Sequence, residues 1–553
     1  MILKISSFYV YPALFILFIF LSGCRSFTKR TDDPLFHKAL ANGYLVNEGY
    51  RRCLDFVYDW LKFADPETGL IPRNLGASVD IWDPKDSAAD NYPFMVLTAA
   101  ILDNDLFEGT MHDILMAEQK YTNRLGSLPD IYSFSKRDFT FEDIDMTRII
   151  FGAAEYVKDG LLALTEYLGH SPWSDRMIEI VDDIWEHALY DTPYGNIPSL
   201  NVEVNGELLQ TLSRLYWMTG DEKYLEQAVR LGDYYLLGNQ HPTRDMDLLR
   251  LRDHGCEIVS GLCEVYVTLA FADPAKKAEY QEHVYEMLDR ILETGTNEDG
   301  LFYNQVNPRT GEILNDGIAD TWGYTYNAYY SVYMLDNHEP YRDAILKVFS
   351  NLSNYVSFDW ERGSADGYAD AIESALNLYN REPVPEAAVW IDSEIQVMWS
   401  MQDVPQREGL EKWQHRGVIE GWHGDGNFAR TTIMYCLWKT QGITMSPWSN
   451  TLIYGAERDN DIIRIAVHAG DRWSGKMHFD YPRHREVFSL PMDYPRINQF
   501  PEWFTADRER KYTITNLNNE ESVEYSGRQL IDGIHMEVVA GDTIYLELRA
   551  IAK

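Results

Sequence analysis

Cysteine and basic side chains are scarce in this chain of 553 residues, which has five cysteines and 49 lysines and arginines against 86 aspartates and glutamates. The formal net charge of −37 argues against nucleic acid and anionic membrane surfaces as partners. Cys256 and Cys263 lie seven residues apart on an expected helix, too far apart to form a disulfide. With Cys53 and Cys436 they show no metal-site spacing. We expect buried free thiols, no metal and no other cofactor.

Recognised catalytic signatures are also missing. The sequence has no metal-ligand motif, no nucleophile elbow and no phosphate-binding glycine loop. After the N-terminus it has no further apolar run of the length that a membrane span requires. Candidate site residues must therefore be sought in the pattern of helices and loops.

The N-terminus carries the most specific signal. Lys4 precedes the apolar stretch FYVYPALFILFIF, which Leu21-Ser22-Gly23-Cys24 follows directly. This stretch has the length of a signal peptide and is short for a permanent span. The ending resembles a bacterial lipobox, in which the cysteine becomes the lipidated first residue. The resemblance implies that residues 1–23 are removed and that Cys24 tethers the protein to the cell envelope, its only attachment to a membrane.

A repeated pattern follows, in which an apolar helix, a short polar turn and an aromatic residue opening an amphipathic helix recur every 49 to 66 residues. The marker aromatics are Phe107, Trp173, Tyr224, Tyr280, Tyr341 and Trp390. Such self-similarity is typical of helical-repeat folds, with one helical hairpin in each unit. Inner helices that are apolar on most sides and outer helices that are amphipathic indicate two concentric rings.

We therefore predict a mainly α fold, an (α/α) toroid of six or seven hairpins, with an open solenoid as the alternative. The expected inner helices are 91–103, 150–168, 201–219, 256–272, 322–336, 367–380 and 427–441. After Pro447, alternating stretches such as KYTITNL and TIYLELRA predict an antiparallel, sandwich-like β domain. The predicted domains are thus 24–447 and 448–553.

Polar residues beside glycine recur in the loops before successive inner helices. These loops cover residues 90–94, 199–207, 250–257, 320–327, 362–370 and 421–430. Ordinary N-capping by Asp or Asn would explain any one of them. Their recurrence at the same end of successive inner helices favours one shared cleft.

The last of these loops, GWHGDGNFAR, contains His423, Asn427 and Arg430. The helix macrodipole disfavours a cation in the first turn, so Arg430 indicates a bound anion or a salt bridge to Asp425. Tyr324 and Tyr326 in TWGYTYN offer phenols for proton transfer, although core packing is expected for one of them. The predicted substrate-binding residues are Trp322, as a stacking platform, with Trp422, His254, Arg252, Asn91 and Asp425.

Two reactions fit these loops. Hydrolysis needs two carboxylates, for which the candidates are Asp90, Glu203, Asp253, Asp320, Asp366 and Asp425. β-Elimination beside a uronic acid needs a group that neutralises the carboxylate, such as Asn427 or Arg430, and a base such as His423 or a loop tyrosine. Two local basic clusters would offset the acidity of the chain: Arg250 with Arg252, and Arg483, His484, Arg485 and Arg496. An exposed strand edge is the alternative for the second cluster.

The chain resembles (α/α)-toroid enzymes of glycan-utilising bacteria through Gly206-Glu207-Leu208-Leu209-Gln210 and the stretch from Met218 to Tyr224. GWHGDGNFARTTIMYCLWKTQG further resembles a lipoprotein family of ulvan-degradation systems, whose members are broad-specificity ulvan lyases or oligosaccharide dehydratases. This resemblance implies an anionic substrate of sulfated rhamnose and uronic acid.

The first hypothesis is therefore an exported lyase with His423, Tyr324, Tyr326, Asn427 and Arg430 as catalytic residues. A glycoside hydrolase on the same scaffold and a non-catalytic glycan-binding lipoprotein are the alternatives. The oligomeric state does not follow from the sequence.

Overall fold

The computed structural model describes residues 33–403, 417–422 and 424–551, without the side chain of His254. The chain forms two compact units. A helical unit comprises the described residues of Tyr50–Tyr435 and Pro482–Glu502, and a β unit comprises the described residues of Met1–Gly49, Cys436–Tyr481 and Trp503–Lys553. The segment Pro482–Glu502, which we expected in the β domain, thus belongs to the helices. Helices α2 (Pro34–Trp60) and α17 (Asp425–Thr440) contribute residues to both units.

The helical unit is built on an inner set of buried helices. They are α3 (Tyr92–Leu102), α6 (Met146–Glu155) with α7 (Leu162–Leu168), α9 (Val202–Thr219), α11 (Glu257–Ala272), α13 (Trp322–Asp336), α15 (Ala365–Tyr379) and the first part of α17. A wide turn of π-helix, η4 (Tyr156–Leu161), joins α6 to α7. These ranges agree with the helices expected from the apolar pattern, and a mainly helical fold is confirmed.

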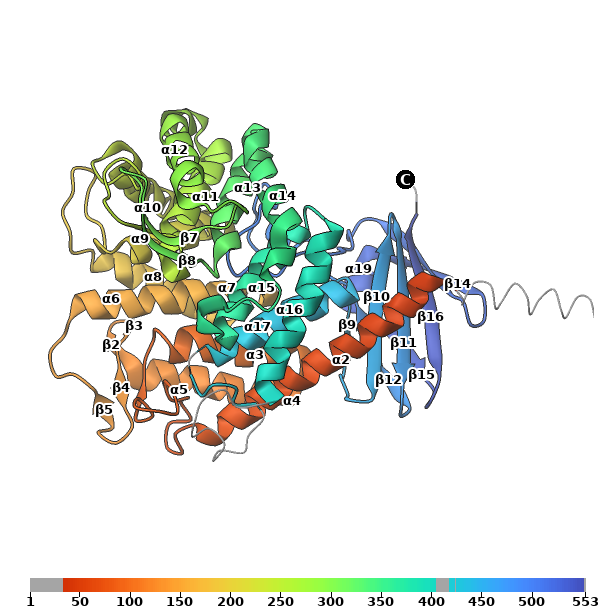
Figure 1. Ribbon diagram of the computed structural model, residues 1–553. Coiled ribbons are helices and arrows are strands. Elements are labelled where there is room, and N and C mark those ends of the chain that lie inside the picture. Colours follow the sequence, from red (N-terminus) through yellow and green to blue (C-terminus); the bar gives the residue numbers. More distant parts are fainter. Residues whose placement is uncertain (1–32, 404–416, 423, 552–553) are drawn as a thin grey trace, which may run out of the picture. The chain divides into compact units, whose positions relative to one another are not determined.

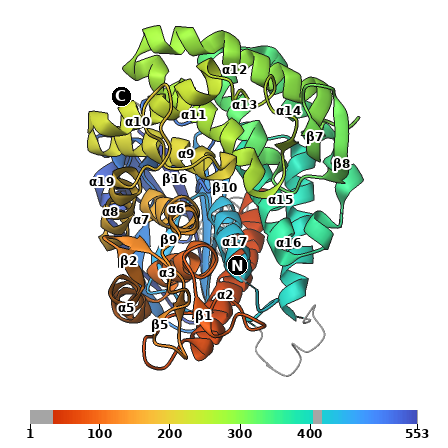
Figure 2. The same cartoon turned by 90° about the vertical axis from the view of Figure 1, so that its left-hand side faces the viewer.

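Each inner helix packs on the next one in the chain. Contacts join α3 to α7, α6 to α9, α9 to α11, α11 to α13 and α13 to α15 (Figure 2). The Thr431 hydroxyl of α17 donates to the Ala369 carbonyl of α15 at 3.0 Å. The Gly426 N–H of α17 then donates to the Asn91 side chain, just before α3, at 2.9 Å. The succession of inner helices therefore returns to its start, as in a toroid and unlike an open solenoid.

The outer helices explain the repeat signature. They are α5 (His112–Thr122), α8 (Pro172–Glu186), α10 (Glu222–Gly232), α12 (Pro274–Gly295), α14 (Glu339–Asn351) and α16 (Pro385–Asp403). The marker tyrosines are buried, and each donates its hydroxyl to an aspartate of the preceding repeat. Tyr224 donates to Asp182 at 3.1 Å, Tyr280 to Asp233 at 2.7 Å and Tyr341 to Asp289 at 2.9 Å. Each of these tyrosines thus joins adjacent repeats, and its buried hydroxyl has a hydrogen-bond partner.

The helical unit also contains short strands. They form three antiparallel sheets: β1 (Ile81–Trp82), β4 (Tyr132–Ser133) and β5 (Asp138–Phe139); β2 (Asn123–Leu125) and β3 (Leu128–Pro129); and β6 (Leu249–Arg250), β7 (Tyr303–Asn307) and β8 (Glu312–Ile318). The sequence did not reveal these strands. The strands β1 to β6 have only two or three residues, too few to show a periodicity, and the longer β7 and β8 were not predicted either.

The β unit contains two antiparallel sheets (Figure 1). The larger has the order β10 (Leu452–Asp459), β11 (Ile462–Ala469), β16 (Thr543–Ala550), β13 (Lys511–Asn516) and β14 (Glu521–Ser526). The smaller has the order β15 (Ile534–Val538), β12 (Trp473–His478) and β9 (Thr444–Ser446). Alternating burial along β11 reflects the alternation seen in the sequence. The antiparallel strands were expected, whereas their stacking as a sandwich stays a prediction.

Among the described residues, no helix combines the length and apolarity that crossing a bilayer requires. Cys24 and the predicted signal peptide before it lie outside those residues.

Two glycines set the closest approach between inner helices. A Cβ atom at Gly206 of α9 would lie 2.4 Å from the Ile258 nitrogen of α11, and one at Gly261 would lie 2.5 Å from the Gly206 carbonyl oxygen. Backbone meets backbone at this crossing, so no side chain can move aside.

We predict that Gly206→Ala lowers the free energy of unfolding by about 1–3 kcal/mol, because the methyl group forces α9 and α11 apart. Gly109→Ala is the control, since a Cβ atom there meets nothing within 4 Å. It should leave stability unchanged or raise it by up to about 1 kcal/mol, the helix preference for alanine. Chemical denaturation measures both, and equal stability of the two variants would contradict the account of the crossing.

Candidate active site

A cavity of about 560 Å³ lies in the helical unit, at the ends of the inner helices where their chains begin. Its lining comes from the approach to α3, from η4, from the first turns of α11 and α13 and from the first two turns of α15 and α17. This volume lies in the range of roughly 300–1,000 Å³ that is usual for small-ligand sites. The loop 199–207 before α9 contributes no lining residue, so Glu203 lies away from the cavity wall.

The lining is strongly acidic. Its ten carboxylates are Asp86, Asp90, Glu155, Asp159, Asp253, Glu257, Glu361, Asp366, Asp370 and Glu420, and its five basic residues are Arg73, Lys85, Lys158, Arg362 and Arg430. An ionised carboxylate only accepts hydrogen bonds, so this wall suits ligands rich in donors such as hydroxyl groups. It disfavours ligands that carry carboxylates of their own.

Arg430 is the centre of the best-defined part of the wall. Its guanidinium lies 2.7 Å from Asp370 and 2.9 Å from Glu373, and it donates to the side-chain oxygens of Asn427 at 2.9 Å and Asn498 at 3.1 Å. A buried charge is tolerated only when it is paired in this way. The anion that the sequence led us to expect beside Arg430 is thus supplied by α15, and not by Asp425.

Only one of the two carboxylate oxygens of Asp370 accepts hydrogen bonds from the described residues. Its Oδ1 accepts from Arg430 at 2.7 Å and from the Tyr324 hydroxyl at 2.9 Å. No hydrogen bond to Oδ2 is found within the described part of the chain, and the Asp370 side chain is 17% exposed. A carboxylate oxygen is therefore presented to whatever occupies the cavity.

A second ion-pair group lies on η4 and α11. The Lys158 ammonium lies 2.7 Å from Asp159 Oδ1 and 2.5 Å from Glu257 Oε1. Burial alone would lower the pKa of Lys158, but Asp159 and Glu257 outweigh burial and raise it. Lys158 therefore stays a cation within the acidic wall.

Glu155 lies beside this group and is almost completely buried. Burial, with Glu207 and Asp159 adding to it, raises the pKa of Glu155 well above its ordinary value. Carboxylate oxygens of Glu155, Asp159 and Glu207 lie within 4.8 Å of one another. Such a triad can share a proton or hold a cation, as can the group of His484, Asp493 and Glu502. The expectation that the protein uses no metal stays a prediction.

The predicted proton-transfer residues have different surroundings. Tyr324 lines the cavity, but burial, with Asp370 and Glu373 adding to it, raises its pKa well above the ordinary value, so the phenol keeps its proton. Tyr326 is fully buried and donates to the Gly300 carbonyl at 2.6 Å, outside the lining. His423 lies outside the described residues, and its role stays a prediction.

The predicted binding residues are divided in the same way. Trp422 lines the cavity, and Arg252 lies 3.8 Å from the lining residue Glu361. Trp322 is fully buried against Phe349, so it offers no face for stacking on a sugar. Asn91 is also fully buried and accepts from Gly426. The backbone of His254 lies in the short helix Asp253–Cys256.

Asp425 is structural. It is buried and accepts from the Trp60 indole at 3.0 Å and from the N–H groups of Ile419, Glu420 and Gly421 at 3.0–3.2 Å. It thus holds the loop against the first turn of α17. The N–H groups that it binds precede the helix, so Asp425 is not the N-cap that the sequence offered as an alternative. Asn427 lines the cavity instead, and its side chain donates to Asp366 at 2.7 Å.

The wall residues that were not singled out from the sequence include Glu155, Lys158, Asp159, Asp370 and Asn498. Glu155, Lys158 and Asp159 were overlooked because they lie within a long apolar helix. Charged residues at such buried positions were the signal that could have revealed them. Asn498 had no such signal, because its segment follows a β-strand region.

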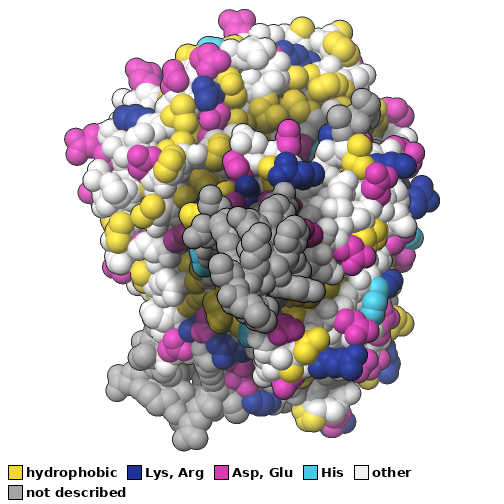
Figure 3. Space-filling model, turned by 90° about the vertical axis from the view of Figure 1, so that its right-hand side faces the viewer, with side chains coloured by type: hydrophobic (Ala, Val, Ile, Leu, Met, Phe, Trp, Pro, Cys, Tyr) yellow, Lys and Arg dark blue, Asp and Glu magenta, His cyan; other side chains and the backbone are white. Residues whose placement is uncertain are grey.

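The predicted basic clusters do not form one continuous positively charged surface. Arg496 is buried against Glu166 at 2.7 Å, and buried Arg483 donates to the Phe500 carbonyl at 2.9 Å. Arg250 pairs with Asp253. On the surface drawn in Figure 3, Lys and Arg side chains are scattered among Asp and Glu side chains. Arg250, Arg252, Arg483 and Arg496 thus have acidic or carbonyl partners.

No protein-family model matches the chain, and no curated protein matches its sequence. The resemblance to ulvan-degrading lipoproteins therefore stays a prediction.

Several solved structures are similar to this chain. They include the cellobiose 2-epimerase of Bacillus thermoamylovorans B4167 (14% identity, 56% of this chain, 87% of that chain, TM-score 0.38). The GH76A α-1,6-mannanase of Salegentibacter sp. HEL1_6 has 11% identity over 70% of this chain and 98% of its own, with a TM-score of 0.40. The unsaturated glucuronyl hydrolase of Bacillus sp. GL1 has 15% identity over 53% and 86%, with a TM-score of 0.35. All three are carbohydrate-active enzymes. Likeness at this level leaves the chemistry of the present site to its own residues.

Asp320, next to the wall, yields a prediction on pH. Burial, with Asp370, Glu361 and Asp253 adding to it, raises its pKa from 3.8 to about 8. The folded state thus holds a proton that the unfolded state has lost, and stability must fall as pH rises between these values, by about 1.4 kcal/mol per pH unit for one proton.

Asp320→Asn should therefore gain stability relative to the parent protein as pH rises from about 5 to about 8, since the amide never has to ionise. Its Oδ1 can still accept from the Thr321 N–H. Urea unfolding across this pH range measures the difference, with the exposed Asp316→Asn as control. A difference that does not change with pH would show that Asp320 ionises normally.

Proposed function

We propose that the protein is a glycoside hydrolase that cleaves uncharged oligosaccharides in this cavity. The observation that carries the proposal is the pairing of Arg430 with Asp370 and Glu373, on a wall of ten carboxylates and five basic residues. Arg430 is already neutralised, so it is a poor partner for a uronate. The donor-rich surface of a neutral sugar suits acceptor oxygens.

The chemistry follows from two carboxyl groups in different environments. Glu155, whose pKa is raised mainly by burial, is the proton donor. Its proton passes to the glycosidic oxygen as the bond from the anomeric carbon to that oxygen breaks. Water attacks the anomeric carbon, and Asp370 Oδ2 takes the proton that the water loses. One water is consumed, and solvent returns the proton from Asp370 to Glu155.

Arg430 and Tyr324 support Asp370 in this scheme. Both donate to Oδ1, which fixes the carboxylate and directs Oδ2 to the cavity. Trp422, which also lines the cavity, offers an aromatic surface for a sugar ring in place of the buried Trp322.

β-Elimination is the second candidate, favoured by the meeting of Tyr324, Asn427 and Arg430 in one cavity. It is less well supported, because both neutralising groups already have acidic partners: Asn427 donates to Asp366, and Arg430 pairs with Asp370 and Glu373. A substrate carboxylate would have to displace them.

One screen separates the two reactions. Neutral oligosaccharides and uronic-acid glycans including ulvan are incubated with the protein, while reducing ends and the ultraviolet absorbance of unsaturated uronates are followed together. We expect new reducing ends from neutral substrates without that absorbance. Absorbance from ulvan would overturn the proposal in favour of the lyase, and binding without either signal would favour a non-catalytic role.

Glu155→Gln and Asp370→Asn should each lower kcat by about 10²–10⁴-fold, the usual contribution of a general acid or base. Glu394→Gln is the matched control, because Glu394 is a buried carboxyl outside the lining that accepts from the Ser357 N–H at 2.9 Å. It should keep the parent rate. Full activity in one of the two cavity variants would remove the replaced residue from its role. Activity abolished by a chelator would remove both Glu155 and Asp370 from these roles.

We also propose that Cys24 is lipidated and holds the enzyme at the bacterial cell envelope, as the Leu21-Ser22-Gly23-Cys24 sequence supports. Cys24→Ser should abolish incorporation of labelled palmitate and release the protein from the membrane fraction. Cys53→Ser, at a buried thiol, is the control and should remain labelled and membrane-bound. Undiminished labelling of Cys24→Ser would contradict the anchor.

A further inference from the structure

Asn498 reaches the cavity from a segment distant in sequence from every inner helix. It lies on Pro482–Glu502, which connects β12 to β13 in the chain and belongs to the helical unit. Asn498 is almost completely buried, and it lines the cavity together with Arg430 and Asp159.

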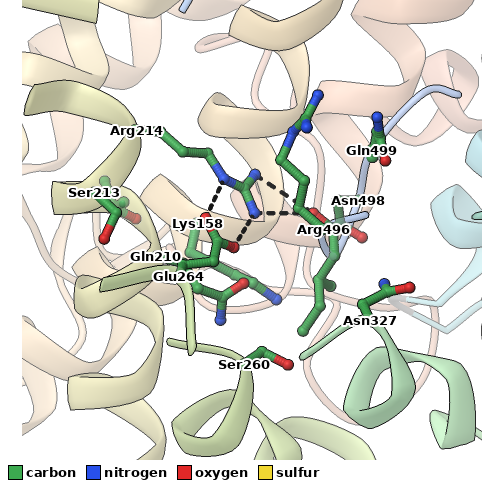
Figure 4. A network of polar contacts seen from close by, with 12 residues as sticks. Lys158, Gln210, Ser213, Arg214, Ser260, Glu264, Asn327, Arg496, Asn498 and Gln499 are labelled. Carbon is green, nitrogen blue, oxygen red and sulfur yellow. Dashed lines mark hydrogen bonds and ion pairs between the residues drawn. The ribbon is translucent and has the colours of Figure 1, made fainter. Parts of the chain in front are cut away.

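Buried ion pairs fix this segment among the inner helices. Arg496 pairs with Glu166 of α7 at 2.7 Å. Arg214 of α9 pairs with Glu264 of α11 at 2.7 Å and also donates to the Ile497 carbonyl at 3.4 Å (Figure 4). The two residues before Asn498 are therefore anchored, which leaves its position little freedom.

Asn498 spans the two ion-pair groups of the wall. Its N–H donates to Glu373 at 2.8 Å, and its Oδ1 accepts from Arg430 at 3.1 Å. Its Nδ2 donates to Asp159 Oδ1 at 3.0 Å. The backbone has φ of +59°, a left-handed conformation that asparagine tolerates better than most residues.

We infer that Asn498 is a positioning residue of the proposed active site, whose amide holds the Arg430–Asp370 pair and the Lys158–Asp159 pair at a fixed separation. The inference rests on the proposed function, because Asp370 belongs to the first pair and Glu155 lies beside the second. Asparagine is suited to the task because its amide has an acceptor for Arg430 and a donor for Asp159 on one short side chain.

Asn498→Gly tests the side chain alone, since glycine accepts the left-handed backbone and keeps the N–H bond to Glu373. We expect kcat to fall about 10- to 100-fold, the effect of misplacing reacting groups by about 1 Å, with KM little changed. Asn337→Gly is the matched control, because Asn337 is exposed at a φ of +56° where α13 ends. It should keep the parent kcat. Parent kcat in Asn498→Gly would overturn the inference.

Asn498→Asp gives a readout that simple loss of packing would not produce. The new carboxylate can still accept from Arg430, but its other oxygen replaces the donor to Asp159. The local charges matter here: Lys158, Glu155 and Glu207 surround Asp159.

Two carboxylates in contact share a proton and repel each other once both ionise. Relative to the parent protein, Asn498→Asp should therefore lose both kcat and resistance to urea as pH rises from about 5 to about 8. Arg430 and Glu373, on the other side, are unchanged between parent and variant.

Urea unfolding needs no substrate, so it tests the contacts of Asn498 separately from the proposed hydrolase activity. If the protein has no hydrolase activity but the stability deficit of Asn498→Asp grows with pH, the proposed function is overturned. The link that the Asn498 amide makes between Arg430 and Asp159 then still stands. If the parent protein is a hydrolase but the stability and kcat of Asn498→Asp follow those of the parent at every pH, only the inferred role of Asn498 is overturned.

Discussion

The buried positive charge of Arg430 is the constraint on which the rest of the site depends. A guanidinium in the interior must be neutralised and hydrogen-bonded, and here the partners come from separate parts of the chain. Asp370 and Glu373 are supplied by α15, Asn427 by α17 itself and Asn498 by the segment 482–502. Neutralisation of Arg430 thus ties two inner helices and a distant segment together. Because Arg430 is already paired, its positive charge is not available to bind the carboxylate of a uronate.

The acidity of the whole chain has a local counterpart in the cavity. Five basic residues among ten carboxylates leave the wall acidic, and the residues that pair, such as Lys158 with Asp159 and Glu257, are arranged within the wall. Burial raises the pKa of Glu155 well above its ordinary value, whereas Asp370 is paired with Arg430. This difference is what acid–base hydrolysis requires.

Much of the helical unit was predictable, because an apolar stretch followed by a turn and a marker aromatic reports local packing. Tyr224, Tyr280 and Tyr341 show why: each aromatic reaches an aspartate one repeat earlier, so the period follows from a contact between repeats. The site was less predictable. Arg430 and Tyr324 were found through their place at the start of inner helices, but the same rule selected Trp322 and Tyr326, which point into the core. Asn498 depends on long-range folding that no local pattern encodes.

In the proposed reaction, water adds across a glycosidic bond of an uncharged oligosaccharide in the cavity. The mass balance of a single cleavage tests this claim most directly. Mass spectrometry of a defined neutral oligosaccharide and its products should give product masses that sum to the substrate plus one water. Products from a uronic-acid oligosaccharide whose masses sum to the substrate alone, with neutral oligosaccharides left intact, would show elimination and contradict the account.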